Sequence, residues 1–181
     1  MSGDPIYIEI DEASWRGHLD NIEAWLNTTL TNQVMFRQLL EDVQPKLYEP
    51  HIRQFVGEIA ETARRHEADA EGFYKMIGRD PSAARKKAGM LMARARGVAS
   101  EALASASGTE ASWQGLQALL PASLHAQSGF AVAEQLALAI GLREMAEAAF
   151  AIENEQATGH LILKELMLEV AAIAILYKAP V

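Results

Sequence analysis

A histidine interrupts an otherwise apolar helical stripe near the middle of the chain. The stripe recurs in alternating steps of four and three residues, and its members are Ile52, Val56, Ile59, Ala63, His66, Ala70, Phe73 and Ile77. If this segment is one helix, His66 points inward, close to the middle of the buried face. An inward imidazole is a metal ligand, an acid or base, or a core residue that has a hydrogen-bond partner. At this point all three roles stay open.

Polar residues also interrupt the other long apolar stripes near their middles. They are Thr29 and Gln33 in the first predicted helix, Gln127 and Ser128 in the fourth, and Gln156 in the last. Burying one polar side chain without a partner costs about 1–3 kcal/mol. Several such residues at similar depth are easier to explain if they meet one another or a bound species. We therefore predict a polar core layer formed by Gln33, His66, Gln127 and Gln156.

Helix-forming residues dominate the chain, and the breaks between helical segments are few. Ser14 or Asp11 caps the first helix, and Gly78 and Gly141 end two others. SASGTEASWQG is predicted to be a loop leading into a short turn or helix, after which Pro121 opens the fourth helix. The predicted helices cover residues 14–43, 51–77, 82–105, 121–140 and 143–177. Because the connections are short, neighbouring helices should be antiparallel. The pattern predicts an all-α bundle over residues 14–178, in one domain.

The first 13 residues differ from the rest of the chain. Ile6, Ile8 and Ile10 alternate with Tyr7 and Glu9, a period of two that is typical of extended backbone. We expect residues 1–13 to form an N-terminal arm that packs along the bundle. The alternative is an arm exchanged with a partner chain.

Composition excludes several classes of protein. The chain has 181 residues, half of them apolar, and no cysteine, which excludes disulfides, iron–sulfur clusters and thiol catalysis. The longest apolar stretch, residues 170–177, is far shorter than the roughly 20 residues that span a bilayer. The first residues do not resemble a secretory signal. We expect a cytoplasmic protein that does not enter a membrane.

The net charge of −8 argues against general binding to nucleic acid or to an anionic membrane. One basic patch stands out between residues 79 and 97, and it comprises Arg79, Arg85, Lys86, Lys87, Arg94 and Arg96. Such a run is typical of a solvated helix face. The more specific interpretation is a docking surface for an acidic protein partner, or for an acidic face of a second copy of the chain. We expect a homodimer.

A four-helix bundle with a polar midsection is also the scaffold of ferritin-like di-iron and di-manganese proteins. The segment LAIGLREMAEAAFAIENEQATGHLIL resembles the last two helices of the YciF-like family of bacterial ferritin-like proteins. The segment ETARRHEADAEGFYKMIG is similar to that family's second helix. The resemblance covers about residues 17–176. It implies a ferritin-like antiparallel four-helix bundle, here with an additional short helix and the extended arm, and a bacterial, stress-associated role.

The resemblance also implies where metal ligands would lie. Gln33 stands where the family's first helix presents a glutamate, and no carboxylate lies near His125, where the family carries a Glu-His pair. Glu155 matches best, but His160 follows it by five residues, a splay of about 140° around the helix. The candidate ligands for iron or manganese are His66, Glu67, Glu155, His125 and His160. Because Gln33 is neutral, we expect a dinuclear centre that is reduced or absent.

Three functions follow from these observations. The first is a non-catalytic or weakly metal-binding ferritin-like protein with no cofactor. The second is a di-iron or di-manganese oxidase or ferroxidase that uses His66, Glu67 and Glu155. The third is a helical self-assembly or partner-binding module. A hydrolase nucleophile elbow and a Gly-rich phosphate loop are both missing from the sequence.

Overall fold

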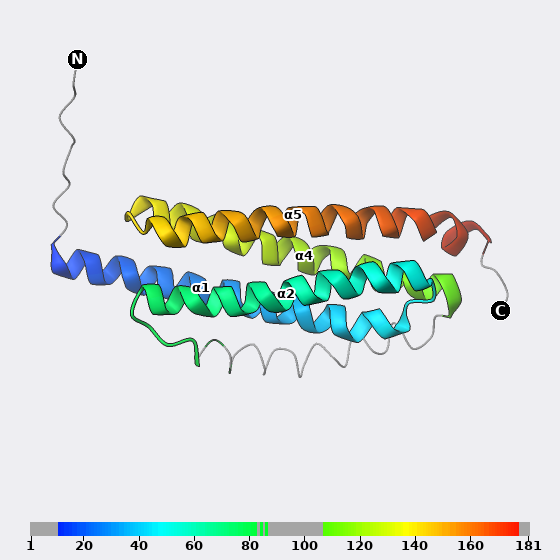
Figure 1. Cartoon of the computed structure of the whole chain (residues 1–181), viewed down its shortest axis with the longest axis horizontal. Coiled ribbons are helices and arrows are strands. Elements are labelled where there is room, and N and C mark those ends of the chain that lie inside the picture. The colour runs from blue at the N-terminus through cyan, green and yellow to red at the C-terminus, as the bar shows by residue number, and fades with distance from the viewer. Residues whose placement is uncertain (1–10, 83, 85, 87–106, 178–181) are drawn as a thin grey trace, which may run out of the picture.

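The computed structural model describes residues 11–82, 84, 86 and 107–177, and this part of the chain is an all-helical bundle (Figure 1). Its long helices lie side by side and comprise α1 (Glu12–Val43), α2 (Pro50–Met76), α4 (Gly108–Ala139) and α5 (Arg143–Ala172). A 3₁₀ turn, η1 (Gln44–Lys46), follows α1, and a π-helical turn, η2 (Ile173–Tyr177), ends the described chain. The predicted all-α bundle is confirmed. Residues 1–10 of the predicted arm and most of the predicted helix 82–105 lie outside the described residues.

The ends of the helices follow the expected local chemistry. Asp11 caps α1, because its Oδ1 accepts a hydrogen bond from the Ser14 amide at 2.9 Å. Pro50 is the first residue of α2, where its missing N–H costs no helical hydrogen bond. After α2 and α4, Gly78 and Gly141 adopt left-handed φ angles of 67° and 77°, a conformation that glycine adopts without strain. These residues set the antiparallel connections.

The fourth helix differs from the prediction. Helix α4 begins at Gly108, and Pro121 lies inside it instead of opening it. The separate short helix predicted for SASGTEASWQG is therefore wrong, since residues 108–115 form the first turns of α4. Proline deprives the Gln117 carbonyl of its helical donor, but Pro121 and Gln117 are both exposed, so that water can reach the carbonyl. Buried Leu116 and Leu119 hold these first turns against the bundle.

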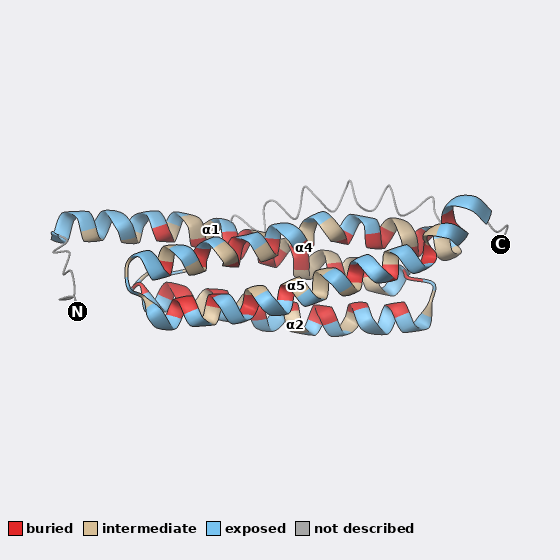
Figure 2. Cartoon of the chain, turned by 90° about the horizontal axis from the view of Figure 1, so that it is seen from above, coloured by how far each residue is buried: buried red, intermediate tan, exposed pale blue. Residues whose placement is uncertain are grey.

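Buried residues follow the inner faces of the helices (Figure 2) and form two apolar clusters. One cluster contains Leu26, Phe73 and Phe130, and the other contains Leu40 and Leu163, among further residues. Helix α1 packs extensively on α2 and α4, and α4 packs on α5, whereas α2 and α5 contact each other much less. The bundle is therefore least tightly closed along the seam between α2 and α5.

Helices α1 and α4 meet closely at Gly129. The Trp25 indole Nε1 donates to the Gly129 carbonyl at 2.9 Å, and Thr29 Oγ1 donates to the same oxygen at 3.2 Å. A Cβ at Gly129 would lie 3.1 Å from Thr29 Cγ2 and 3.3 Å from Thr29 Cα, so that only glycine fits without a shift. This contact fixes how far α1 slides along α4, and with it the height of Gln33, which follows Thr29 by one helical turn.

No described helix is both long enough and apolar enough to cross a membrane.

Candidate functional site

The structure brings three predicted polar residues together between the two apolar clusters. Gln33 comes from α1, His66 from α2 and Gln156 from α5, with exposed fractions of 0, 3 and 6%. Gln156 Nε2 lies 2.6 Å from Gln33 Oε1 and 3.5 Å from His66 Nδ1. Gln33 Nε2 in turn donates to the Ala63 backbone carbonyl at 2.8 Å. We call this set the polar layer.

The orientation of both amides in the polar layer is set by one backbone group. The Ala63 carbonyl can only accept, so Gln33 must turn its amide nitrogen toward it and its oxygen toward Gln156. Gln156 must then donate to Gln33, and its second N–H faces His66 Nδ1. This leaves the Gln156 Oε1 atom buried, with no donor among the described residues. A buried acceptor without a donor is uncommon and calls for an explanation.

His66 connects the polar layer to the surface. Because its Nδ1 faces an N–H of Gln156, the proton of the neutral ring belongs on Nε2, which lies 3.0 Å from Glu155 Oε2. Glu155 is 52% exposed and also accepts from Arg65 Nη2 at 2.9 Å. Burial lowers the pKa of His66, and the hydrogen bond to Glu155 opposes that shift only in part. His66 is thus a neutral donor to Glu155 at pH 7.

Gln127 does not belong to the polar layer, so the prediction for this residue is wrong. Its Nε2 donates to Glu153 Oε1 at 2.7 Å, at a half-buried position on the side of the α4–α5 pair. The inward stripe of α4 runs through Ser123, Ala126 and Phe130 instead. Gln127 follows Ala126 by one residue, which turns it about 100° away from the core.

The five candidate metal ligands do not converge. Glu67 turns toward α1, where its carboxylate accepts from Arg37 Nε at 2.5 Å, whereas Glu155 lies on the side of His66. His125 is exposed, and His160 Nδ1 lies 2.7 Å from Ser123 Oγ. Among the described residues, no three histidine or acidic side chains are grouped so that they could hold a metal ion. Glu67, His66 and Glu155 therefore do not form the shared site that the oxidase hypothesis requires.

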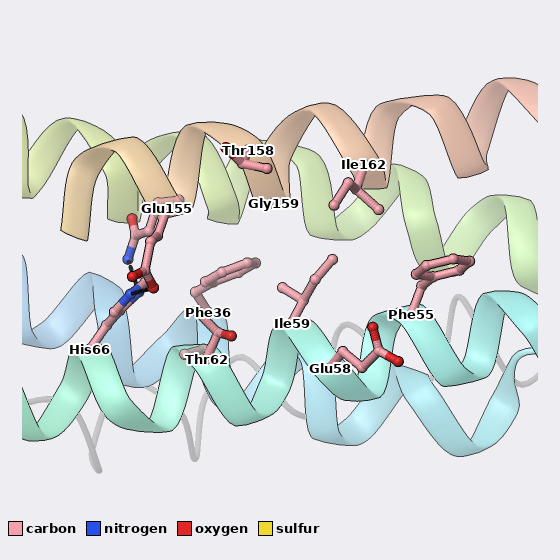
Figure 3. A pocket seen from close by; sticks show the side chains of 12 residues that line it. Phe36, Phe55, Glu58, Ile59, Thr62, His66, Glu155, Thr158, Gly159 and Ile162 are labelled. Carbon is pink, nitrogen blue, oxygen red and sulfur yellow. Dashed lines mark hydrogen bonds and ion pairs between the residues drawn. The ribbon is translucent and has the colours of Figure 1, made fainter. Parts of the chain in front are cut away.

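A cavity of about 310 Å³ opens between α2 and α5, beside the polar layer (Figure 3). Helix α1 contributes one side chain to it and the other two helices contribute the rest; the lining residues are Phe36, Phe55, Glu58, Ile59, Thr62, Ala63, His66, Glu155, Gln156, Thr158, Gly159 and Ile162. Figure 3 shows His66 and Glu155 at one end, Phe55 and Glu58 at the other, and Ile59 and Ile162 between them. The cavity is mostly apolar, with a polar end at the layer.

Sequence reasoning missed this cavity, although one signal was present. Gly159 lies on the predicted inward stripe of α5, where it contributes no side chain, and Ala63 on α2 contributes only a methyl group. Small residues on facing stripes leave space that larger ones would fill. A second cavity, of about 370 Å³, lies on the other side of the His66–Glu155 pair and is lined by Asp69, Phe73 and Ile152, among others. The pair therefore stands between two openings of the α2–α5 seam.

The predicted basic patch is described only in part. Arg79 forms ion pairs with Asp20 at 2.6 Å and Glu23 at 2.9 Å, both on α1, and Lys86 is exposed. Arg85, Lys87, Arg94 and Arg96 lie outside the residues that the structure describes. Arg79 thus binds its own chain.

Comparisons of the chain with models of protein families, with characterised proteins and with solved structures give no match.

Proposed function

We propose that the protein is a ferritin-like, non-catalytic helical bundle in which a hydrogen-bonded polar layer occupies the place of a dinuclear metal centre. The observation that supports this most directly is the chain of hydrogen bonds from the Ala63 carbonyl through Gln33 and Gln156 to His66. It joins buried polar groups from three helices through neutral side chains, and only the Gln156 Oε1 atom of the layer has no donor among the described residues. A neutral, internally bonded layer has little affinity for iron or manganese, which prefer carboxylate oxygens.

The surrounding charges support the same proposal. Glu67 is held by Arg37, so using it as a ligand would break an ion pair that is only about one-fifth exposed. Among the candidate ligands, Glu155 and His66 remain as an adjacent carboxylate–imidazole pair, and Arg65 competes with any cation there. Two ligands support at most a weak mononuclear site. The stress-associated role that the YciF-like resemblance implies would then rest on binding or structure, without oxidation chemistry.

Metal analysis tests this proposal. Protein purified without chelator should contain far less than one iron or manganese ion per chain, and Fe(II) should not cause oxygen consumption above a buffer control. Two ions per chain, with oxygen consumption lost in Glu155→Gln and retained in the matched control Glu153→Gln, would instead establish the di-metal oxidase. Glu153 is a suitable control because it lies on the same helix and bonds Gln127 outside the layer.

A second candidate function, self-assembly, has one specific observation in its favour. Leu161 and Leu168 on α5 are 57 and 51% exposed and lie seven residues apart, which keeps them on one edge of the helix. Leu176 and Tyr177 continue the exposed apolar surface beyond α5. We propose that a second copy of the chain covers this edge in a two-fold dimer, as the expected homodimer requires.

Sedimentation equilibrium separates this second function from the first. The wild-type chain should sediment as a dimer, and Leu161→Glu with Leu168→Glu should give a folded monomer. A dimer that persists in this variant would exclude α5 as the interface. Lys164→Glu, on the same helix between the two leucines, provides the control for added negative charge.

A further inference from the structure

We propose that the cavity between α2 and α5 is a binding site for a small, uncharged, apolar molecule. The proposal goes beyond the metal-free polar layer, because it assigns a ligand to the space beside that layer. Three features of the cavity lead to it: its apolar floor, the pairing of the polar groups around it, and its size.

The floor of the cavity is apolar and belongs to the core. Phe36, Ile59 and Ala63 are all buried, yet all three line the space. Opposite them, Gly159 contributes no side chain and Ile162 forms an apolar wall. Figure 3 shows Ile59 and Ile162 pointing toward one another across the opening between α2 and α5. Water finds few hydrogen-bond partners on such a floor, so an apolar molecule displaces it favourably.

The polar side chains at the end of the cavity beside the polar layer are already bound within the protein. Glu155 accepts hydrogen bonds from Arg65 at 2.9 Å and from His66 at 3.0 Å. Gln156 Nε2 donates to Gln33 at 2.6 Å. The Gln156 Oε1 atom has no access to solvent, so it does not face the cavity. A ligand therefore completes no hydrogen bond of the layer, and the layer does not require a polar head group.

The charges around the cavity disfavour both kinds of ion. A carboxylate ligand would meet Glu58 and Glu155, and the described residues that line the cavity include no lysine or arginine. An ammonium ligand would give up part of its hydration shell. In return it would meet Glu155, which is already paired, and Glu58, which is exposed so that solvent screens its charge. An uncharged molecule incurs neither cost.

The size of the cavity selects a small molecule over a protein segment. Its volume of about 310 Å³ lies at the lower end of the ~300–1,000 Å³ that is usual for ligand pockets. A helix with its side chains is about 10–12 Å across and does not enter such a space. Phe55 is 42% exposed at the end of the cavity away from His66, where it connects the floor with solvent (Figure 3). A single aromatic ring or a short aliphatic chain fits.

The test is a matched series of three probes on the full chain: toluene, benzylamine and benzoate. They share one aromatic ring, and at pH 7 they are neutral, cationic and anionic. Titrations followed by amide NMR spectra should show that toluene binds at least about tenfold more tightly than either ion, because a charged group loses hydration at the cavity. Equal or tighter binding of either ion, or no binding of toluene at millimolar concentration, would overturn the proposal.

Two variants place the binding within the cavity. A Cβ at Gly159 would make only ordinary contact, 3.8 Å from Ile59 Cγ2, so Gly159→Leu should fold and fill the space. It should abolish toluene binding, whereas Gly17→Leu, on an open face of α1, should leave it unchanged. Undiminished binding in Gly159→Leu would refute the site.

The same spectra locate the probe in the wild-type chain, whether or not Gly159→Leu folds. Toluene should shift the amide signals of Thr62 and Gly159 most strongly, because both residues line the cavity. Largest shifts outside the lining, for example at Gly17, would refute the site. Because metal content is measured separately, a metal-loaded protein would contradict the proposed function and not this result.

Discussion

Replacing Gln33 by methionine tests whether the polar layer is a connected hydrogen-bond chain. Methionine preserves the length of the side chain but removes the donor to Ala63 and the acceptor for Gln156. One N–H of the buried Gln156 amide then has no acceptor, which costs about 1–3 kcal/mol. The Ala63 carbonyl loses less, since it keeps its helical hydrogen bond. For a chain of this length, a loss of about 2 kcal/mol corresponds to a fall of roughly 4–8 °C in Tm.

Urea unfolding followed by circular dichroism measures this change in the free energy of unfolding. The matched control is Gln127→Met, which removes a 2.7 Å hydrogen bond to Glu153 at a half-buried position. We expect the control to lose less than about 1 kcal/mol, because water replaces the lost partner. If Gln33→Met were as stable as the wild type, or if both variants lost equally, the buried chain of hydrogen bonds would not stabilise the fold as argued.

Two further predictions concern pH and packing. Burial lowers the pKa of His66 below its usual 6.5. Below about pH 6.5 the unfolded chain therefore binds a proton that the folded chain does not bind, so the free energy of unfolding falls as the pH falls. This loss levels off below the pKa of His66 in the folded chain. Denaturant titrations between about pH 5 and 6.5 should show a shallower loss for His66→Gln than for the wild type; equal slopes for the two chains would contradict the burial argument. Gly129→Ala should destabilise by about 1–3 kcal/mol, because its Cβ would press against the backbone and side chain of Thr29. At Gly72 no atom lies within 4 Å of an added Cβ, so Gly72→Ala should stabilise the fold by up to about 1 kcal/mol. Thermal melts in which Gly129→Ala and Gly72→Ala shifted Tm in the same direction would refute the close contact between Gly129 and Thr29.

The sequence predicts the helices of this fold well and the spaces between the packed helices poorly. Helical periodicity alone places Gln33, His66 and Gln156 inward at similar depth, and the structure joins them. The prediction for Gln127 is wrong because the buried stripe of α4 is rich in alanine and glycine, so the sequence leaves the inward face of this helix ambiguous by one position. The prediction that Pro121 opens the fourth helix is wrong for a physical reason. A proline on an exposed helix face removes the hydrogen bond only from a carbonyl that water can reach.

The α2–α5 cavity depends on information that no single helix contains. Each stripe specifies what its own helix buries, but the separation of α2 from α5 follows from how α2 packs on α1, α5 packs on α4, and α1 packs on α4. The direction of the Gln156 amide is likewise decided on another helix, by the Ala63 carbonyl. These are properties of the assembled bundle, and sequence patterns describe helices one at a time.

The common direction of the hydrogen bonds in the polar layer has a mechanical consequence. Gln33 both accepts from Gln156 and donates to the Ala63 carbonyl, so each of these two hydrogen bonds polarises the Gln33 amide and strengthens the other. The contact between α5 and α1 and the contact between α1 and α2 therefore strengthen each other. Faster amide exchange around Ala63 on α2 when Gln156 on α5 is replaced would then report this coupling.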